Sequence, residues 1–306
     1  MSTSPANTQP ANNRSPGVHP FWLAATPGLF VFLWSTGFVG AKLGLPYAEP
    51  FTYLVWRFAI VTVLMAALAF LTRAPWPRDA ATWAHIVICG LLLHGVYLGG
   101  VFASINHGVP AGVSALIVGI QPLLTAIAAG PLLNERVTRL QWIGFLLGLA
   151  GVSMVVWNKL GLDAGTPWGM GLSVIALLGM TSGTLYQKKF CPNLDLRTGA
   201  AIQFGAAGIV VFIIASLTET MVVEWSSEFI FALGWMVLVM SLGAISLLFM
   251  LIRRGEATRV ASLFYMVPPS TALLAWFLFD ETLDATALGG MLVAVFGVAL
   301  VNIKRR

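Results

Sequence analysis

Charged residues and cysteines are scarce in this sequence. Charged side chains make up 9% of its 306 residues and hydrophobic ones 58%, and the mean hydropathy is +0.86. Because so little charge cannot cover the surface of a soluble domain, the composition excludes a water-soluble globular protein and indicates that the chain lies in lipid. Of the two cysteines, Cys89 lies in an apolar run and Cys191 in a polar break, which indicates neither a disulfide framework nor a metal site. We expect no metal and no cofactor.

The apolar residues form long continuous runs with short polar breaks between them. A membrane β-strand alternates polar and apolar residues over about ten positions, whereas these runs stay apolar for about twenty, as membrane helices do. The sequence therefore predicts an all-α polytopic membrane protein with ten transmembrane helices. Residues 1–20, rich in Ser, Asn, Pro and Thr, predict a disordered cytoplasmic tail. The predicted spans are residues 22–43, 52–72, 83–105, 110–132, 138–158, 167–189, 198–218, 229–252, 257–279 and 285–303.

Lysine and arginine are distributed unevenly between the two sides of the predicted bundle. Fourteen of the seventeen lie on one side, Lys42 and Lys159 lie on the other, and Arg57 falls within the second span. Because cytoplasmic loops are enriched in positive charge, this distribution predicts that both termini are cytoplasmic. The net charge of +5 then follows from membrane topology, and the expected partner is the lipid bilayer rather than a nucleic acid.

The two halves of the chain repeat with an offset of 146 residues, and we place the five-helix repeats at residues 21–158 and 167–306. Because each repeat has an odd number of spans, the second copy inserts upside down relative to the first. Two bundles of opposite orientation can open a central site to one side and then to the other, which favours a transporter. The first copy has Ala111, Ala115, Pro122, Glu135, Gly144 and Gly151, and the second has Ala257, Ala261, Pro268, Glu281, Gly290 and Gly297.

This repeated pattern of proline, acidic residue and glycine-rich fifth span resembles the drug/metabolite transporter superfamily, and specifically its ten-helix family with paired EamA-type domains. The resemblance covers residues 21–303 and is closest to the bacterial aromatic amino-acid exporters. It implies a central cavity between the first four helices of each half, with the fifth helices outside it. It also implies a multi-pass protein of the bacterial inner membrane that exports amino acids, aromatic and other neutral ones, and related small metabolites.

Other functions stay open at this point. The exported solute could belong to another metabolite class, such as purines, sugars or drugs. An intramembrane enzyme is the rival class, but the acidic cluster of Asp280, Glu281 and Asp284 lies on the outer side, away from prenyl diphosphates. Ser182 in GMTSG is out of register for an activated serine. We therefore expect no enzymatic activity and no catalytic residues, and a monomer or a weak homodimer.

Polar side chains at span centres are costly in lipid unless they face protein or a water-filled cavity. His94 and Tyr97 are three residues apart near the centre of the third span, so they share one helix face. His94 could bind a substrate carboxylate or shuttle a proton, and it could equally be a neutral imidazole bonded to a neighbouring helix. In the fourth span Gln121 is a further candidate, because serine and threonine often bond their own backbone instead.

Three further aromatic residues complete the predicted cavity set: Trp34, Tyr186 and Tyr265. Each combines ring area with a polar tip, and each lies away from the outermost turns, where aromatic residues anchor helices at the membrane interface. Ordinary packing is the alternative for these rings. Whether these rings reach the cavity depends on which face of each helix points inward.

Prolines mark the fourth span of the first repeat and the ninth span of the chain. Pro122, Pro268 and Pro269 each remove a backbone hydrogen bond and free a carbonyl. They predict kinks that line the cavity or act as hinges, with passive bending as the alternative.

Arg57 is the one strong charge that lies more than a turn inside a predicted span. An arginine there could clamp an anionic group, but its place in the second turn favours the interpretation that it snorkels to the outer surface. No Asp or Glu falls at the centre of any predicted span, which disfavours coupling through a buried acid and the binding of cationic drugs. A sparsely polar, aromatic lining suits a zwitterionic or amphipathic solute.

Overall fold

The computed structural model describes residues 20–109, 111–157, 165–255, 257–279 and 285–303. Regular structure in these ranges is helical, apart from an isolated antiparallel bridge between Ala48 and Val223. The predicted class of an all-helical membrane protein is confirmed. The predicted tail, residues 1–20, lies outside the described residues except for Pro20, and so does the acidic cluster that contains Glu281.

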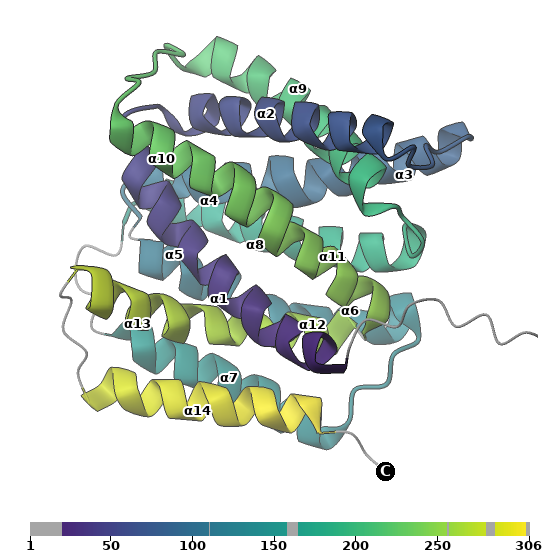
Figure 1. The fold of residues 1–306 in the computed structure, drawn as a ribbon. Helices are drawn as coiled ribbons and strands as arrows, with labels where there is room; N and C mark the ends of the chain where they lie inside the picture. Colours follow the sequence, from purple (N-terminus) through teal and green to yellow (C-terminus); the bar gives the residue numbers. More distant parts are fainter. Residues whose placement is uncertain (1–19, 110, 158–164, 256, 280–284, 304–306) are drawn as a thin grey trace, which may run out of the picture.

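The helices follow one another as rods at the positions of the predicted spans (Figure 1). In the described part of the chain, seven rods are long and apolar enough to cross a membrane. The uninterrupted rods are α1 (Pro20–Gly44), α2 (Pro50–Leu71), α7 (Arg139–Val156), α8 (Pro167–Phe190), α9 (Leu196–Thr218) and α14 (Ala285–Asn302).

The remaining rods are interrupted near their centres. Two of them contain a π-helical segment, in which backbone hydrogen bonds join residues five apart instead of the four of an α-helix. The third-span rod is α3 (Ala80–Gly90), η1 (Leu91–Val96) and α4 (Tyr97–Asn106), and the eighth-span rod is α10 (Ser227–Trp235), η3 (Met236–Ala244) and α11 (Ile245–Arg254). The fourth-span rod is α5 (Ala111–Val118) and α6 (Gln121–Leu133), and the ninth-span rod is α12 (Ala257–Ser262), the 3-10 turn η4 (Leu263–Met266) and α13 (Val267–Phe279).

The rods pack in an arrangement with approximate two-fold symmetry. Figure 1 shows α7 beside α14 at one edge of the molecule and α2 beside α9 at the opposite edge, and each pair joins corresponding helices of the two halves. Between these edges, α1 contacts η3 and α13, and its counterpart α8 contacts η1, α4 and α6 in the same way. These exchanged contacts are those expected of two related bundles that face each other.

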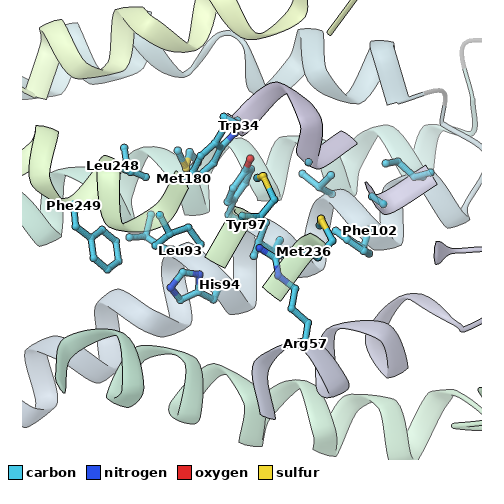
Figure 2. A pocket seen from close by; sticks show the side chains of 17 residues that line it. Trp34, Arg57, Leu93, His94, Tyr97, Phe102, Met180, Met236, Leu248 and Phe249 are labelled. Carbon is cyan, nitrogen blue, oxygen red and sulfur yellow. The ribbon is translucent and has the colours of Figure 1, made fainter. Parts of the chain in front are cut away.

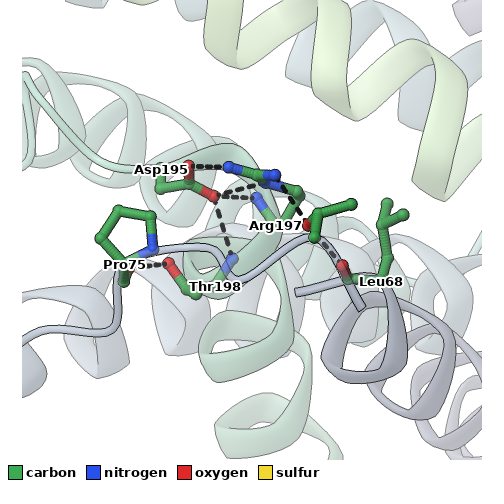
Figure 3. A network of polar contacts seen from close by, with 6 residues as sticks. Leu68, Pro75, Asp195, Arg197 and Thr198 are labelled. Carbon is green, nitrogen blue, oxygen red and sulfur yellow. Dashed lines mark hydrogen bonds and ion pairs between the residues drawn. The ribbon is translucent and has the colours of Figure 1, made fainter. Parts of the chain in front are cut away.

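The first backbone N–H groups of a helix have no partner within the helix. At the start of many helices here, a carboxylate or hydroxyl side chain accepts hydrogen bonds from these groups. At the start of α9, Asp195 accepts from the backbone nitrogens of Arg197 (2.9 Å) and Thr198 (3.4 Å). The Arg197 guanidinium pairs with this carboxylate at 2.7 Å and holds its pKa below the ordinary value. Arg197 also donates to Thr72, and the Thr198 hydroxyl donates to the carbonyl of Pro75, which fastens α9 to the end of α2 (Figure 3).

The glycines of α7 and α14 pack these two helices against each other. A Cβ atom built on Gly151 would lie 2.4 Å from the backbone nitrogen of Ala294, and one on Gly297 would lie 2.5 Å from the backbone nitrogen of Gly148. Small residues thus let two membrane helices approach backbone to backbone, where dispersion contacts are strongest. Within the described residues these glycines form a contact between the fifth helices of the two halves of the same chain.

We expect Gly151→Leu to separate α7 from α14 and to destabilise the protein by about 1–3 kcal/mol, because the new side chain has no space beside Ala294. Gly171→Leu is the matched control, since a Cβ at Gly171 in α8 would meet no atom within 4 Å. Thermal unfolding of the two variants in detergent should lower Tm for Gly151→Leu alone. An equal loss in both variants would contradict the close packing.

Candidate functional site

A cavity lies among α1, α2, the α3–α4 rod, α8 and the α10–α11 rod, so both halves of the chain contribute to it (Figure 2). The space between its side chains, together with the open solvent at its mouth, is about 640 Å³. Its wall is mostly apolar, and we find no acidic side chain on it among the described residues. The side chains labelled in Figure 2 are Trp34, Arg57, Leu93, His94, Tyr97, Phe102, Met180, Met236, Leu248 and Phe249.

The two halves supply different chemistry to this wall. Trp34 in α1 and Met180 in α8 stand 146 residues apart, at equivalent repeat positions, and both line the cavity. His94 in η1 and Met240 in η3 form a second pair of this kind. The first half therefore contributes polar and aromatic groups where the second half contributes methionines, which are soft and adapt to the shape of an apolar group.

Both π-helical segments lie at this cavity. Residues 91–96 and 237–242 are equivalent repeat positions, so the interruption occurs at the same point in each half. The backbone shows the wider turn directly, because the N–H of Tyr97 donates to the carbonyl of Leu92 and the N–H of Ile245 to that of Met240, each five residues earlier. Single π turns occur mostly at functional sites, because they change the direction of the side chains that follow them. Composition and periodicity do not reveal them.

Arg57 points into the protein, which corrects the interpretation that it snorkels to the surface. Its side chain is 1% exposed, its Nε donates to the Ser241 hydroxyl at 3.0 Å, and its Nη1 has no hydrogen-bond partner among the described residues. The second turn of α2 packs against η3, so the guanidinium reaches the cavity instead of the lipid surface. Ser241 was not recognised in the sequence, because nothing there marks it as the partner of a distant arginine.

His94 is 2% exposed and lies between aromatic rings. It stacks on Phe204 with ring centroids 4.0 Å apart and meets the edge of Phe58 at 6.0 Å. Gln203 is the polar side chain beside it, but neither imidazole nitrogen has a partner within hydrogen-bonding distance among the described residues. The ring therefore stands at the cavity wall with Gln203 as its polar neighbour.

Trp34 and Tyr97 also lie on the cavity wall, at 6% and 5% exposure. Trp34 packs edge-to-face against Phe264 with ring centroids 5.2 Å apart. Together with His94 and Arg57 they bring four of the predicted site residues to one cavity.

Three predicted residues lie elsewhere. Gln121 is buried in α6, where its side-chain nitrogen donates to the Thr125 hydroxyl at 3.0 Å. Tyr265 packs its ring against Gly148 of α7, in a second apolar cluster beside the fifth helices. Tyr186, near the end of α8, bonds His85 in the middle of α3 at 2.7 Å. The fourth span of each half, expected at the cavity, thus contributes no described residue to its wall.

The predicted prolines follow breaks in their rods. Pro122 is the second residue of α6, directly after the interruption at residues 119–120. Pro268 and Pro269 follow the 3-10 turn η4 near the start of α13. Because proline has no N–H, it fits the first turn of a helix, and each break therefore lies just before a proline.

These features describe a polytopic helical membrane protein with a cavity between two related halves. The sequence profile of the EamA-like transporter family matches residues 28–157 and 167–303. The chain belongs to this family and is therefore a membrane transporter.

Relatives of known name agree with this assignment. The chain is 28% identical to an uncharacterized inner membrane transporter, YedA, of Escherichia coli (strain K12), over 89% of this chain and 88% of the relative. It is 25% identical to a probable amino-acid metabolite efflux pump of the same strain, over 88% and 91% of the two chains. One solved crystal structure has the same fold, with a TM-score of 0.76 at 20% identity, over 90% of this chain and 95% of the other.

The two cysteines, which in the sequence indicate neither a disulfide framework nor a metal site, lie in contact. The sulfur of Cys89 in α3 is 3.8 Å from that of Cys191 at the end of α8. Residues 102 positions apart in the chain thus meet at one end of the bundle.

We expect mild oxidation with copper phenanthroline to join Cys89 to Cys191 within one molecule, because their sulfurs need to move by less than 2 Å to reach the length of a disulfide. Loss of maleimide labelling, restored by reductant, would measure the reaction. Cys89→Ser is the control, because its remaining thiol, Cys191, is partly exposed and should stay reactive after the same treatment. Exclusive formation of dimers linked between molecules would contradict the contact between α3 and α8.

Proposed function

We propose that this transporter exports amino acids, aromatic and other neutral ones, and related small metabolites from the cytoplasm by alternating access. The observation that carries the proposal is the cavity itself, which combines one polar corner with an extended apolar wall. The name of the 25% identical efflux pump supports the same substrate class. The bacterial inner membrane is the proposed location, with both termini in the cytoplasm.

The lining suits an amphipathic solute. Arg57, His94 and Tyr97 supply hydrogen-bond donors, and most of the remaining wall is apolar, with methionine, leucine and phenylalanine its commonest side chains. Binding sites for small molecules commonly combine a predominantly apolar wall with a few polar groups that fix orientation. A polar head near Arg57 and an apolar side chain against Met236 would satisfy both parts of the cavity.

Polar contacts at the two ends of the bundle are suited to act as gates. At one end, the Glu135 carboxylate accepts from the backbone nitrogens of Ala257 (2.9 Å) and Thr258 (3.3 Å), which joins the first half to α12. At the other end, Glu219 accepts from the backbone nitrogens of Phe51 (2.8 Å) and Thr52 (2.6 Å), which joins the second half to α2. Alternating access requires contacts of this kind to break in turn, one end at a time.

Pro122, Pro268 and Pro269 lie beside interruptions where the helices can pivot as these ends open. Gln121 and Tyr265 lie on the same two rods, so movement of either rod would change their surroundings. Neither residue needs to touch the solute for this role. Whether the transporter acts as a monomer or a weak homodimer does not change this proposal.

We expect purified protein in liposomes to exchange external labelled phenylalanine for internal unlabelled phenylalanine. Loss of hydrogen bonds at the polar corner in the double variant His94→Ala, Tyr97→Phe should reduce the initial rate at least about tenfold, since each lost bond contributes about 1 kcal/mol. Tyr186→Phe is the control, because Tyr186 does not line the cavity. A parallel assay with an imposed pH gradient would reveal proton coupling as accumulation above equilibrium.

Two results would contradict the proposal. No exchange of any amino acid would reject the substrate class and favour another metabolite, such as a purine or a sugar. Unchanged exchange by the double variant would remove His94 and Tyr97 from the binding site.

A further inference from the structure

Arg57 is a buried cation without a counter-ion. Its Nε is used by Ser241, its Nη1 is free of partners, and the described residues of the cavity wall include no carboxylate. The described carboxylates of Glu135, Asp195 and Glu219 are engaged at the starts of α12, α9 and α2. The fixed positive charge at the cavity is therefore uncompensated by these groups.

This charge cannot be removed by losing a proton, because the guanidinium stays protonated under all ordinary conditions. An isolated charge in a low-dielectric interior is costly, and an anion that enters the cavity would relieve that cost. Figure 2 shows Arg57 reaching from α2 toward Tyr97 at the polar end of the wall. A planar carboxylate at this point can accept from the guanidinium with two charge-assisted hydrogen bonds.

The same cavity offers little to an ammonium group. A zwitterionic amino acid would bring a second charge of the same sign as Arg57, and no described wall residue carries an acid to pair with it. A cationic amine would meet the repulsion of Arg57 with no described acid on the wall to offset it. Discrimination of this kind comes from unpaired and like charges as much as from attraction.

We propose that the preferred substrates are monoanionic carboxylates with an aromatic or branched apolar body and no α-ammonium group, and that Arg57 binds their carboxylate. The methionine, leucine and phenylalanine side chains of the wall then hold the apolar body. This inference rests on the proposed export of amino acids and related small metabolites through the cavity, and within that range it places the related carboxylic acids ahead of the amino acids themselves.

Three probe compounds share one phenyl ring and differ in their charged groups, so their affinities show which charge the cavity binds. L-Phenylalanine is the zwitterion, 3-phenylpropanoate lacks only its ammonium group, and 2-phenylethylamine lacks only its carboxylate. Equilibrium binding of each probe to the full-length protein in detergent at pH 7.4, measured by calorimetry, avoids leakage of the acid through a bilayer. We expect 3-phenylpropanoate to bind at least tenfold more tightly than phenylalanine, and 2-phenylethylamine to show no binding.

Variants at the proposed anion site then test the residue. Arg57→Gln should weaken binding of 3-phenylpropanoate by about thirtyfold or more, the usual effect of removing one partner of a buried charge pair. Arg57→Lys should retain part of the affinity, because it keeps the charge without the planar fork. Ser241→Ala keeps the charge and removes only the partner of Nε, so a small loss is expected even if Arg57→Gln does not fold.

The outcomes separate this inference from the proposed function. Binding and liposome exchange of phenylalanine without binding of 3-phenylpropanoate would overturn the carboxylate preference and leave amino-acid export intact. Tight binding of 2-phenylethylamine, or wild-type affinity in Arg57→Gln, would also overturn it. Failure of all three probes to bind, together with no exchange of any amino acid, would reject the proposed function and the inference with it.

Discussion

Lipid offers no hydrogen bonds to a backbone, and this constraint governs the whole structure. It requires every spanning segment to be helical and moves nearly all charged side chains to the ends of the rods. It also explains the carboxylates at helix starts, where Asp195 and Glu219 accept from N–H groups that would otherwise lack partners. Interrupted backbone occurs where neighbouring helices or a cavity surround it, as in η1 and η3. Arg57 is notable because it is a charge retained well inside the bundle.

Duplication explains the frame of the molecule, and divergence between the copies explains its cavity. Glycines that pack α7 against α14 occur in both copies, because backbone contact at the symmetry axis demands small residues from each side. Equivalent positions at the cavity hold different residues, because Trp34 corresponds to Met180 and His94 to Met240. A symmetric frame thus carries an asymmetric site, with polar groups from one half and apolar surface from the other.

Much of the frame could be predicted from the chain alone because lipid makes apolar length and charge placement informative. The helical class, the positions of the spans and the approximate repeat all follow from periodicity, breaker residues and the offset of 146. Two candidates, His94 and Tyr97, came from the cost of burying a polar group in lipid. Trp34 was selected for a ring with a polar tip and Arg57 as a charge inside a span, and the structure brings all four to one cavity. That rule selects residues that face protein, but it does not say which protein surface they face.

Tertiary structure decided the direction of each side chain. Gln121 and Tyr265 obey the same rule as His94, yet they lie in contacts between rods, because neighbouring helices fill the space on their side. The inward course of Arg57 depends on Ser241, and the meeting of Cys89 with Cys191 spans 102 residues. One-dimensional patterns record local preference, whereas these features depend on how rods rotate and approach when they pack. Composition and repeat therefore determined the class and the frame, and packing between distant helices decided the site.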